Sequence, residues 1–234
     1  MPAPDSSSFR ELRPEELLGA LNEVEQKNAP RTLFVAGNAD LLVNGRLRIS
    51  IVGTREPTRP GVDRTRVLAL ELVRREIIVV SGLAKGIDTV AHRTAIEAGG
   101  RTIAVLGTPL DVVYPAENRD IQHLIMRDHL AVSQFAPGSH AGSKAFPMRN
   151  RTMALLSDAT VIVEAGEGSG TLHQGWEALR LGRPLLLMQS LVERVDLSWP
   201  AEMLRFGAEV LTRENLDEVL GEIPGRARGG QLAF

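Results

Sequence analysis

The sequence predicts a Rossmann-like α/β fold, in which a mostly parallel sheet carries helices on both faces. Short β-rich runs alternate with helical stretches along most of the 234-residue chain. Several of these runs are apolar on both faces, which is typical of strands in a parallel sheet that helices cover. Strands that alternate with helices in this way indicate βαβ units, and such units have right-handed crossovers.

Three parts are predicted along the chain. Residues 1–30 form an N-terminal extension with one short helix, since Leu17, Leu18 and Leu21 follow acidic residues within positions 13–27. Residues 31–221 form the Rossmann-like domain, and residues 222–234 form a flexible C-terminal tail. The expected strands of the domain are the runs "TLFVAG", "LRISIVG", "EIIVVSG", "RTIAVLG", "LAVSQF", "ATVIVEAG", "PLLLMQ" and "AEVL".

The helices between these strands have amphipathic spacing. One apolar stripe begins just after Gly61, and a second runs from Ile87 to Ala98. Gly99-Gly100 marks the end of the second helix, because glycine is favoured just beyond a helix C-terminus. Both helices are therefore expected to pack one face against the sheet.

Composition narrows the class of protein. With 43% hydrophobic and 24% charged residues the chain is that of an ordinary globular protein. Its formal net charge of −2 means that nucleic-acid binding would need a local basic patch. The absence of cysteine excludes disulfides and cysteine zinc sites and fits a cytoplasmic location. No apolar run reaches about 18 residues, and the start has no apolar signal segment, so neither membrane spanning nor secretion is expected.

Three strand-to-helix turns contain glycine and are expected to meet at the carboxyl edge of the sheet. They are "VGTREPTRPG" with Gly53 and Arg55; "VSGLAKGID" with Ser81, Gly82, Lys85 and Gly86; and "EAGEGSGTL" with Gly168, Ser169, Gly170 and Thr171. Glycine lets a backbone approach a ligand closely, and a helix N-terminus presents N–H groups suited to phosphate. The sequence therefore predicts a phosphate-binding rim.

Other chemistries lack their motifs. There is no G-x-G-x-x-G after the first strand and no G-x-x-x-x-G-K-[ST], so neither a standard nicotinamide site nor a P-loop is expected. The histidines show no metal-ligand spacing, and Ser81 has no evident base. No catalytic residue, metal site or cofactor is predicted.

The segment "FPMRNR" places Phe146, Arg149, Asn150 and Arg151 at the start of an apolar helix. Two arginines in this position are either solvated residues at a helix entry or a clamp for an anion. Phe146 is either a core residue or an exposed ring that stacks on a base. The residues alone leave both alternatives open.

Taken in order, "IVGTREPTRPG", "VVSGLAKGIDTVAHRTAIEAGGRTIAVLGTPLDVVYPAEN", "FPMRNR" and "VIVEAGEGSGTL" closely resemble the DprA/Smf family. The resemblance covers most of the chain. It implies a non-catalytic protein that binds single-stranded DNA in natural transformation and recombination, with RecA and a second copy of the chain as further partners. It also implies that Arg55, Lys85 and the pair Arg149 and Arg151 line a basic DNA-binding pocket.

Two other functions share this rim. The chain is similar in part to the cytokinin-activating phosphoribohydrolases, which also makes Arg151 the expected phosphate anchor, but Gln174 stands where their signature has a catalytic glutamate. An amide cannot act as that carboxylate, and Glu177 and Glu164 are awkwardly placed substitutes. A sensor of a nucleotide signal is the other alternative, since the accessory domains usual in the DprA/Smf family are missing.

Overall fold

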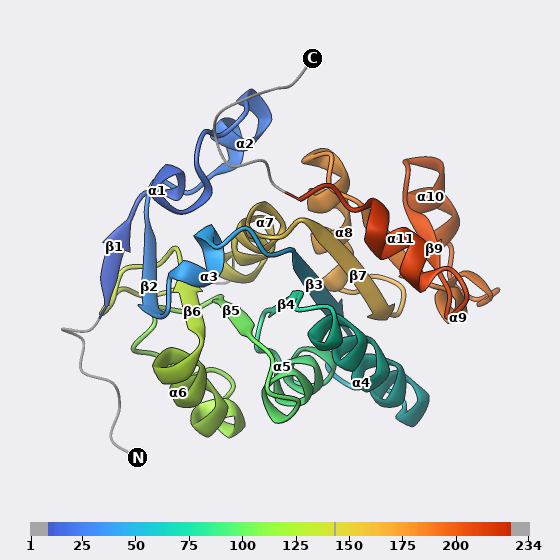
Figure 1. The fold of residues 1–234 in the computed structure, drawn as a ribbon, viewed down its shortest axis with the longest axis horizontal. Helices are drawn as coiled ribbons and strands as arrows, with labels where there is room; N and C mark the ends of the chain where they lie inside the picture. Colours follow the sequence, from blue (N-terminus) through green and yellow to red (C-terminus); the bar gives the residue numbers. More distant parts are fainter. Residues whose placement is uncertain (1–8, 143, 226–234) are drawn as a thin grey trace.

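The computed structural model describes residues 9–142 and 144–225 and contains a nine-stranded sheet (Figure 1). In space the strands follow the order β1-β2-β6-β5-β4-β3-β7-β8-β9. Their bounds are β1 (Arg10–Leu12), β2 (Leu33–Gly37), β3 (Arg48–Gly53), β4 (Ile78–Ser81), β5 (Thr102–Leu106), β6 (Leu130–Ser133), β7 (Ala159–Glu164), β8 (Leu185–Met188) and β9 (Glu209–Leu211). The predicted fold class is confirmed.

Helices cover both faces of this sheet. The helices are α1 (Pro14–Leu18), α2 (Glu23–Asn28), α3 (Asp40–Val43), α4 (Arg59–Arg74), α5 (Ile87–Glu97), α6 (Arg119–Asp128), α7 (Ala145–Leu156), α8 (Thr171–Arg180), α9 (Gln189–Val192), α10 (Trp199–Arg205) and α11 (Leu216–Glu222), with a short 3₁₀ turn at Ala116–Asn118. Helices α7 and α8 lie on one face, and α4, α5 and α6 lie on the other (Figure 1). The helix predicted after Ile87 is confirmed as α5.

The direction of the chain across the sheet reverses between β3 and β7. Both β4 and β7 pair with β3 in parallel, with Ile51 opposite Val161. From β3 the chain moves outward through β4, β5 and β6, whereas from β7 it moves outward through β8 and β9 in the other direction. Helix α4, which follows β3, and helix α8, which follows β7, lie on opposite faces. Such a switch point leaves a crevice at the carboxyl ends of the two strands.

The amino-terminal part differs from the expectation. Residues 13–27 form two helices, α1 and α2, because Gly19 has a φ of 72° and ends the first. Strand β1 pairs antiparallel with β2, and β2 pairs antiparallel with β6. The sheet thus includes residues of the predicted extension, and the three-part division of the chain stays a proposal. Most of the predicted tail, residues 226–234, lies outside the described residues.

A buried core lies on each face and fixes the strands that carry the crevice. Ile49 and Ile51 of β3 and Leu72 of α4 are fully buried. They belong to one core between the sheet and helices α4 and α5. Met153 and Leu156 bring α7 onto the other face. Burying each such side chain contributes about 1.5–3 kcal/mol to folding. Within the described ranges, none of the helices combines the length and hydrophobicity that a membrane span requires.

Candidate functional site

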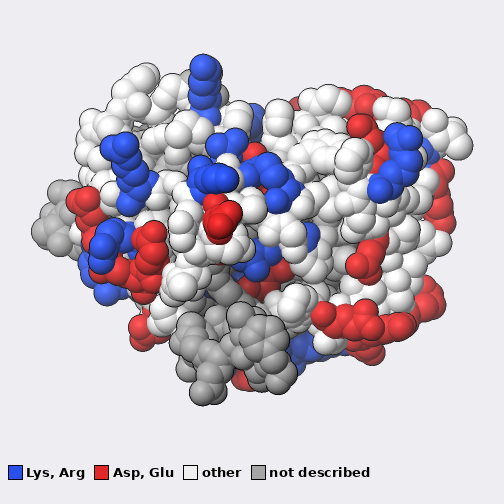
Figure 2. All heavy atoms as spheres, turned by 90° about the horizontal axis from the view of Figure 1, so that it is seen from above, with Lys and Arg blue, Asp and Glu red and all other residues white. Residues whose placement is uncertain are grey.

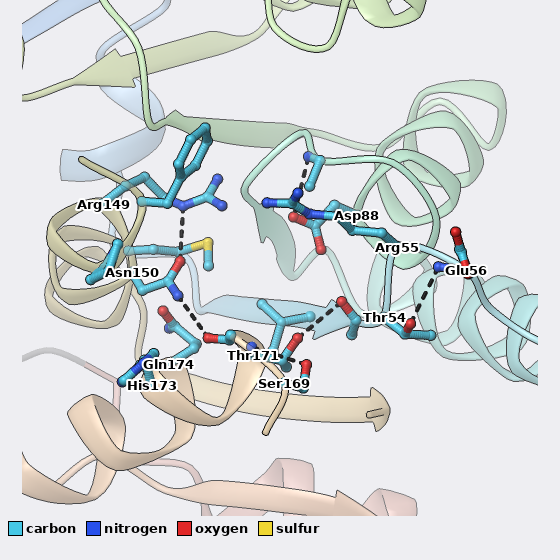
Figure 3. A pocket seen from close by; sticks show the side chains of 17 residues that line it. Thr54, Arg55, Glu56, Asp88, Arg149, Asn150, Ser169, Thr171, His173 and Gln174 are labelled. Atoms are coloured by element: carbon cyan, nitrogen blue, oxygen red, sulfur yellow. Dashed lines mark hydrogen bonds between the residues drawn. The ribbon is translucent and has the colours of Figure 1, made fainter. Parts of the chain in front are cut away.

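A pocket of about 350 Å³ lies at the switch point, between the carboxyl ends of β3 and β7. Its walls come from the turn after β3, the start of α5, the first turns of α7 and the turn that leads into α8 (Figure 3). Open parallel sheets bind ligands at this place, because the loops on either side diverge to opposite faces. The position alone makes this pocket the candidate site.

The three glycine-containing turns are fastened to one another. Thr171 Oγ1 donates to the carbonyl of Gly53 over 3.0 Å and joins the third turn to the first. The N–H of Ile87 donates to the carbonyl of Thr54 over 3.2 Å and joins the second turn to the first. Gly86 has a φ of 77°, and a Cβ there would overlap that same carbonyl oxygen. The rim is therefore one connected body and not three separate loops.

Helix α7 ties the second and third turns together. Arg149 is 6% exposed, and its Nη1 donates to the carbonyl oxygens of Gly82 and, over 2.9 Å, of Val105. Its Nε donates to Asn150 Oδ1 over 2.9 Å, and Asn150 Nδ2 donates to the carbonyl of Gly170 over 3.2 Å (Figure 3). Two adjacent residues of one helix thus hold both turns.

The guanidinium of Arg149 is a buried cation whose hydrogen-bond partners among the described residues are neutral oxygens. Burial lowers the pKa of this group, the nearby Asp88 carboxyl opposes that shift, and Arg55 adds to it. Arginine nevertheless stays charged in proteins. A buried charge whose hydrogen bonds go to neutral oxygens favours the entry of an anion.

Asp88 occupies the backbone donors of the second turn. Its Oδ2 accepts from the N–H groups of Gly82, over 3.2 Å, and Ala84, over 3.3 Å. Burial raises the pKa of the Asp88 carboxyl, and the charge of Arg149 opposes the rise. Asp88, near the start of α5, thus holds the turn that leads into this helix.

The third turn uses its own backbone donors in a similar way. The N–H of Leu172 donates to the carbonyl of Ser169, and the N–H of His173 donates to the carbonyl of Gly170. The expectation that these helix N-termini offer free N–H groups to a phosphate is wrong for these amides. Carbonyl oxygens of the chain already accept these N–H groups, and the guanidinium groups of Arg55 and Arg149 supply positive charge to the site.

Two guanidinium groups and two rings meet at the mouth of the pocket. The Cζ atoms of Arg55 and Arg149 lie 5.7 and 6.0 Å from the ring centroid of Phe146. The Tyr114 ring lies 5.5 Å from that of Phe146, tilted by 49°. Figure 3 shows Arg55 and Arg149 reaching inward from opposite sides, with Glu56 directed away. Positive charge is thus concentrated beside aromatic surface.

The predicted site residues fall into two groups. Those that line the pocket are Gly53, Arg55, Phe146, Arg149, Asn150, Ser169, Gly170 and Thr171. Those that do not are Ser81, Gly82, Lys85, Gly86, Arg151 and Gly168. Ser81 Oγ donates to the carbonyl of Ile51 over 2.7 Å, and Gly82 lies behind Arg149, whose guanidinium a Cβ would overlap. Ser81 and Gly82 therefore lie behind the wall of the pocket and do not form its surface.

Arg151 does not line the pocket, although it was expected to be the stronger phosphate anchor. Its side chain is 46% exposed, and its Nη2 lies 3.2 Å from Oε1 of Glu177. Residues two apart on a helix point about 200° from each other, because an α-helix has 3.6 residues per turn. Arg149 faces the pocket, and Arg151 therefore faces away from it.

Some residues in or beside the pocket carried no signal in the sequence. Thr54 and His173 line the pocket only because they adjoin glycine turns. Tyr114 is the only tyrosine of the chain. It lies in the loop after β5, and its ring packs against that of Phe146. A single aromatic residue in a loop has no periodicity that could have predicted this contact.

The geometry does not favour glycosidic hydrolysis. Gln174 is 1% exposed, and its amide, oriented to satisfy both of its atoms, bonds to the backbone of Asn150 and Ala154 in α7. Glu177 pairs with Arg151 outside the pocket. Neither of the two suggested substitutes, Glu177 and Glu164, is among the lining residues.

The carboxylate of Glu164 is hydrogen-bonded to Thr58, at the start of α4. Its two carboxylate oxygens accept from the N–H and the Oγ1 of Thr58, over 3.0 and 2.8 Å, and hold the start of α4. The described residues also contain no grouping of three or more His, Asp or Glu side chains that could hold a metal ion.

Charge is distributed unevenly over the surface. Seen from above the view of Figure 1, Lys and Arg side chains gather near the middle of the face, and acidic side chains dominate its lower right edge (Figure 2). A chain with a net charge of −2 needs such a local concentration of cations to attract a polyanion.

Comparisons with known proteins agree with this fold. The family model described as DNA recombination-mediator protein A matches residues 14–224. The DNA processing protein DprA of Bacillus subtilis is 34% identical over 197 residues, which are 84% of this chain and 65% of that protein. The chain thus spans just under two thirds of the length of this relative.

Two solved structures are similar over almost the whole chain. DNA processing protein A from Streptococcus pneumoniae has a TM-score of 0.79 at 32% identity and covers 94% of this chain and 76% of its own. DNA processing protein A from Helicobacter pylori, described for its binding of single-stranded DNA, has a TM-score of 0.77 at 26% identity, with 92% and 97% covered. The chain therefore belongs to the DNA recombination-mediator protein A family, the DprA/Smf family that its motifs resemble.

Proposed function

We propose that this protein binds single-stranded DNA in the pocket at the β3–β7 switch point and acts in DNA uptake and recombination. The observation that carries the proposal is the pair of guanidinium groups, Arg55 and Arg149, that face the Phe146 ring at 5.7 and 6.0 Å. Arginine guanidinium groups bind phosphates, and the aromatic surface that Phe146 shares with Tyr114 adjoins them, so the site offers contacts for both parts of a nucleotide. The single-stranded DNA bound by the Helicobacter relative supports the same ligand.

The structure favours a single strand over a duplex. The Arg149 charge lies inside a pocket of about 350 Å³, and its side chain is 6% exposed. The paired bases of a duplex cannot enter such a space, whereas one unpaired nucleotide can. Contacts of this kind are tolerant of sequence, because every base has an aromatic face.

The test is a fluorescence anisotropy titration with oligo-dT, single-stranded and annealed, over a range of salt concentrations. We expect binding of the single strand to be tighter than that of the duplex. If Arg55 and Arg149 together hold one phosphate and Lys85 holds the next, the slope of log K against log salt is about −1.4. No binding at low salt would overturn the proposal. A slope near zero, with a mononucleotide competing equally well, would indicate a nucleotide-signal sensor instead.

From family membership we further propose RecA as a protein partner, a homodimer as the working form and a cytoplasmic location. The expected results are a dimer in sedimentation equilibrium and faster RecA filament growth on DNA coated with a single-strand binding protein. A monomer at every concentration, or an unchanged rate of filament growth, would contradict the corresponding proposal.

A further inference from the structure

Tyr114 is an exposed aromatic residue at the edge of the pocket. It lies in the loop between β5 and the 3₁₀ turn, and it is 48% exposed. Its ring packs against that of Phe146, which itself lines the pocket. Tyrosine thus continues the aromatic surface of the pocket outward to solvent.

Phe146 has little free surface for a base. Arg55 and Arg149 lie over its ring, Tyr114 packs on it, and the backbone of Gly107 is so close that a Cβ there would touch the ring. A ring that already has two cations and a second ring as neighbours cannot also accept a base across a full face. The base platform must therefore be another ring.

Lys85, in the second glycine turn, is paired with Glu117 of the 3₁₀ turn that follows the loop of Tyr114. Its Nζ is 2.6 Å from Glu117 Oε1, and both side chains are about half exposed, at 55% and 51%. The pKa of Lys85 is raised because its ammonium donates a hydrogen bond to the Glu117 carboxylate and is attracted by that charge, and Tyr114 raises it by a smaller amount. Lys85, expected inside the pocket, is therefore an exposed cation held beside the loop of Tyr114.

We infer that the strand leaves the pocket over Tyr114, whose ring stacks on the base that follows the phosphate held by Arg55 and Arg149. The inference rests on the proposed function and adds its path and its base contact. Arg149 is a buried cation, Tyr114 is an exposed ring, and Lys85 is an exposed cation that Glu117 holds beside the loop of Tyr114. A single strand offers a phosphate, a base and a phosphate to such a set, and the Tyr114 hydroxyl is not needed for stacking.

The experiment compares oligo-dT with an abasic oligonucleotide of the same length, which has the same phosphates but no bases. At one salt concentration we expect the wild type to bind oligo-dT more tightly than the abasic strand. Tyr114→Leu keeps an apolar side chain against Phe146 but has no ring, and it should weaken binding of oligo-dT about fivefold or more. Its affinity for the abasic strand should not change. Tyr114→Phe should behave as the wild type.

The outcomes separate this inference from the proposed function. If the wild type binds neither strand, the proposed function fails, and the stacking role fails with it. If the wild type binds both, but Tyr114→Leu weakens the two equally or neither, the DNA-binding function stands and the stacking role of Tyr114 is wrong. Urea denaturation of Tyr114→Leu, expected to match the wild type because the residue is exposed, excludes a folding defect.

Discussion

Replacing Arg149 by alanine is expected to weaken the binding of oligo-dT by about tenfold to a hundredfold. A hydrogen bond from a charged group contributes about 1.5–3 kcal/mol, and Arg149 is the buried cation of the pocket. Arg149→Lys should restore only part of the loss. The guanidinium of Arg149 donates to Gly82, Val105 and Asn150 and still faces the pocket. The single ammonium of lysine cannot make all of these contacts. Fluorescence anisotropy of the three proteins measures the effect.

Arg151→Ala is the matched control, because it removes an arginine from the same helix but from its outer face. Arg151 is 46% exposed and paired with Glu177, so its loss should change the affinity by less than about threefold. An equal loss in the two alanine variants would show that the strand follows the outside of α7. Circular dichroism must show an unchanged fold for Arg149→Ala, since that variant also leaves two carbonyl groups without their partner.

Replacing Asp158 by alanine is expected to lower the free energy of unfolding by about 3–5 kcal/mol. Asp158 is 1% exposed and Arg48 is 4% exposed. The carboxylate accepts from the backbone N–H of Arg48 over 2.8 Å and from its guanidinium over 3.3 and 3.1 Å. Without it, Arg48 remains as a buried charge without its counter-ion. Urea denaturation, monitored by tryptophan fluorescence, measures the change.

The control is Asp63→Ala, which breaks an ion pair on the exposed face of α4. Asp63 and Arg66 are 60% and 58% exposed, and such pairs contribute about 0.2–1 kcal/mol at most. A similar loss of stability in both variants would mean that burial does not decide the strength of the Arg48–Asp158 pair. Asp158 precedes the first residue of β7, at the end of the strand far from the pocket, so the folded fraction of Asp158→Ala should still bind oligo-dT.

The strands of the central sheet could be predicted because their apolar runs are long enough to bury both faces. The mostly parallel direction of the strands followed from their alternation with helices, but the exceptions could not be predicted, since an apolar run reads the same in a parallel and an antiparallel pair. The antiparallel pairing of β2 with β6 is the example. Strand β1 was missed because its three residues, Arg10–Leu12, are mostly exposed and carry no apolar pattern. Gly19 was read as part of a helix that it in fact ends.

The site was predictable as a meeting of turns and only partly as a set of side chains. Glycine positions identified the rim, because they report where the backbone must turn or approach closely. Whether Arg149 or Arg151 faces the pocket depends on the rotation of α7 about its axis. That helix has apolar residues on several sides, so its sequence does not fix the rotation. Tyr114 could not be placed for a related reason, since the loop that carries it has no period, and Lys85 was expected inside the pocket because the direction of a side chain in a turn cannot be read from the sequence.

Asp88 gives the site a further property. By accepting the N–H groups of Gly82 and Ala84, it places an anion of the protein itself on the backbone donors of that turn. The attraction for a ligand then depends on the side chains of Arg55 and Arg149. Every residue except proline provides the same backbone N–H donor, whereas a single substitution can change or remove a charged side chain. The affinity of this pocket for an anion can therefore change by single substitutions, while the turns that shape it stay the same.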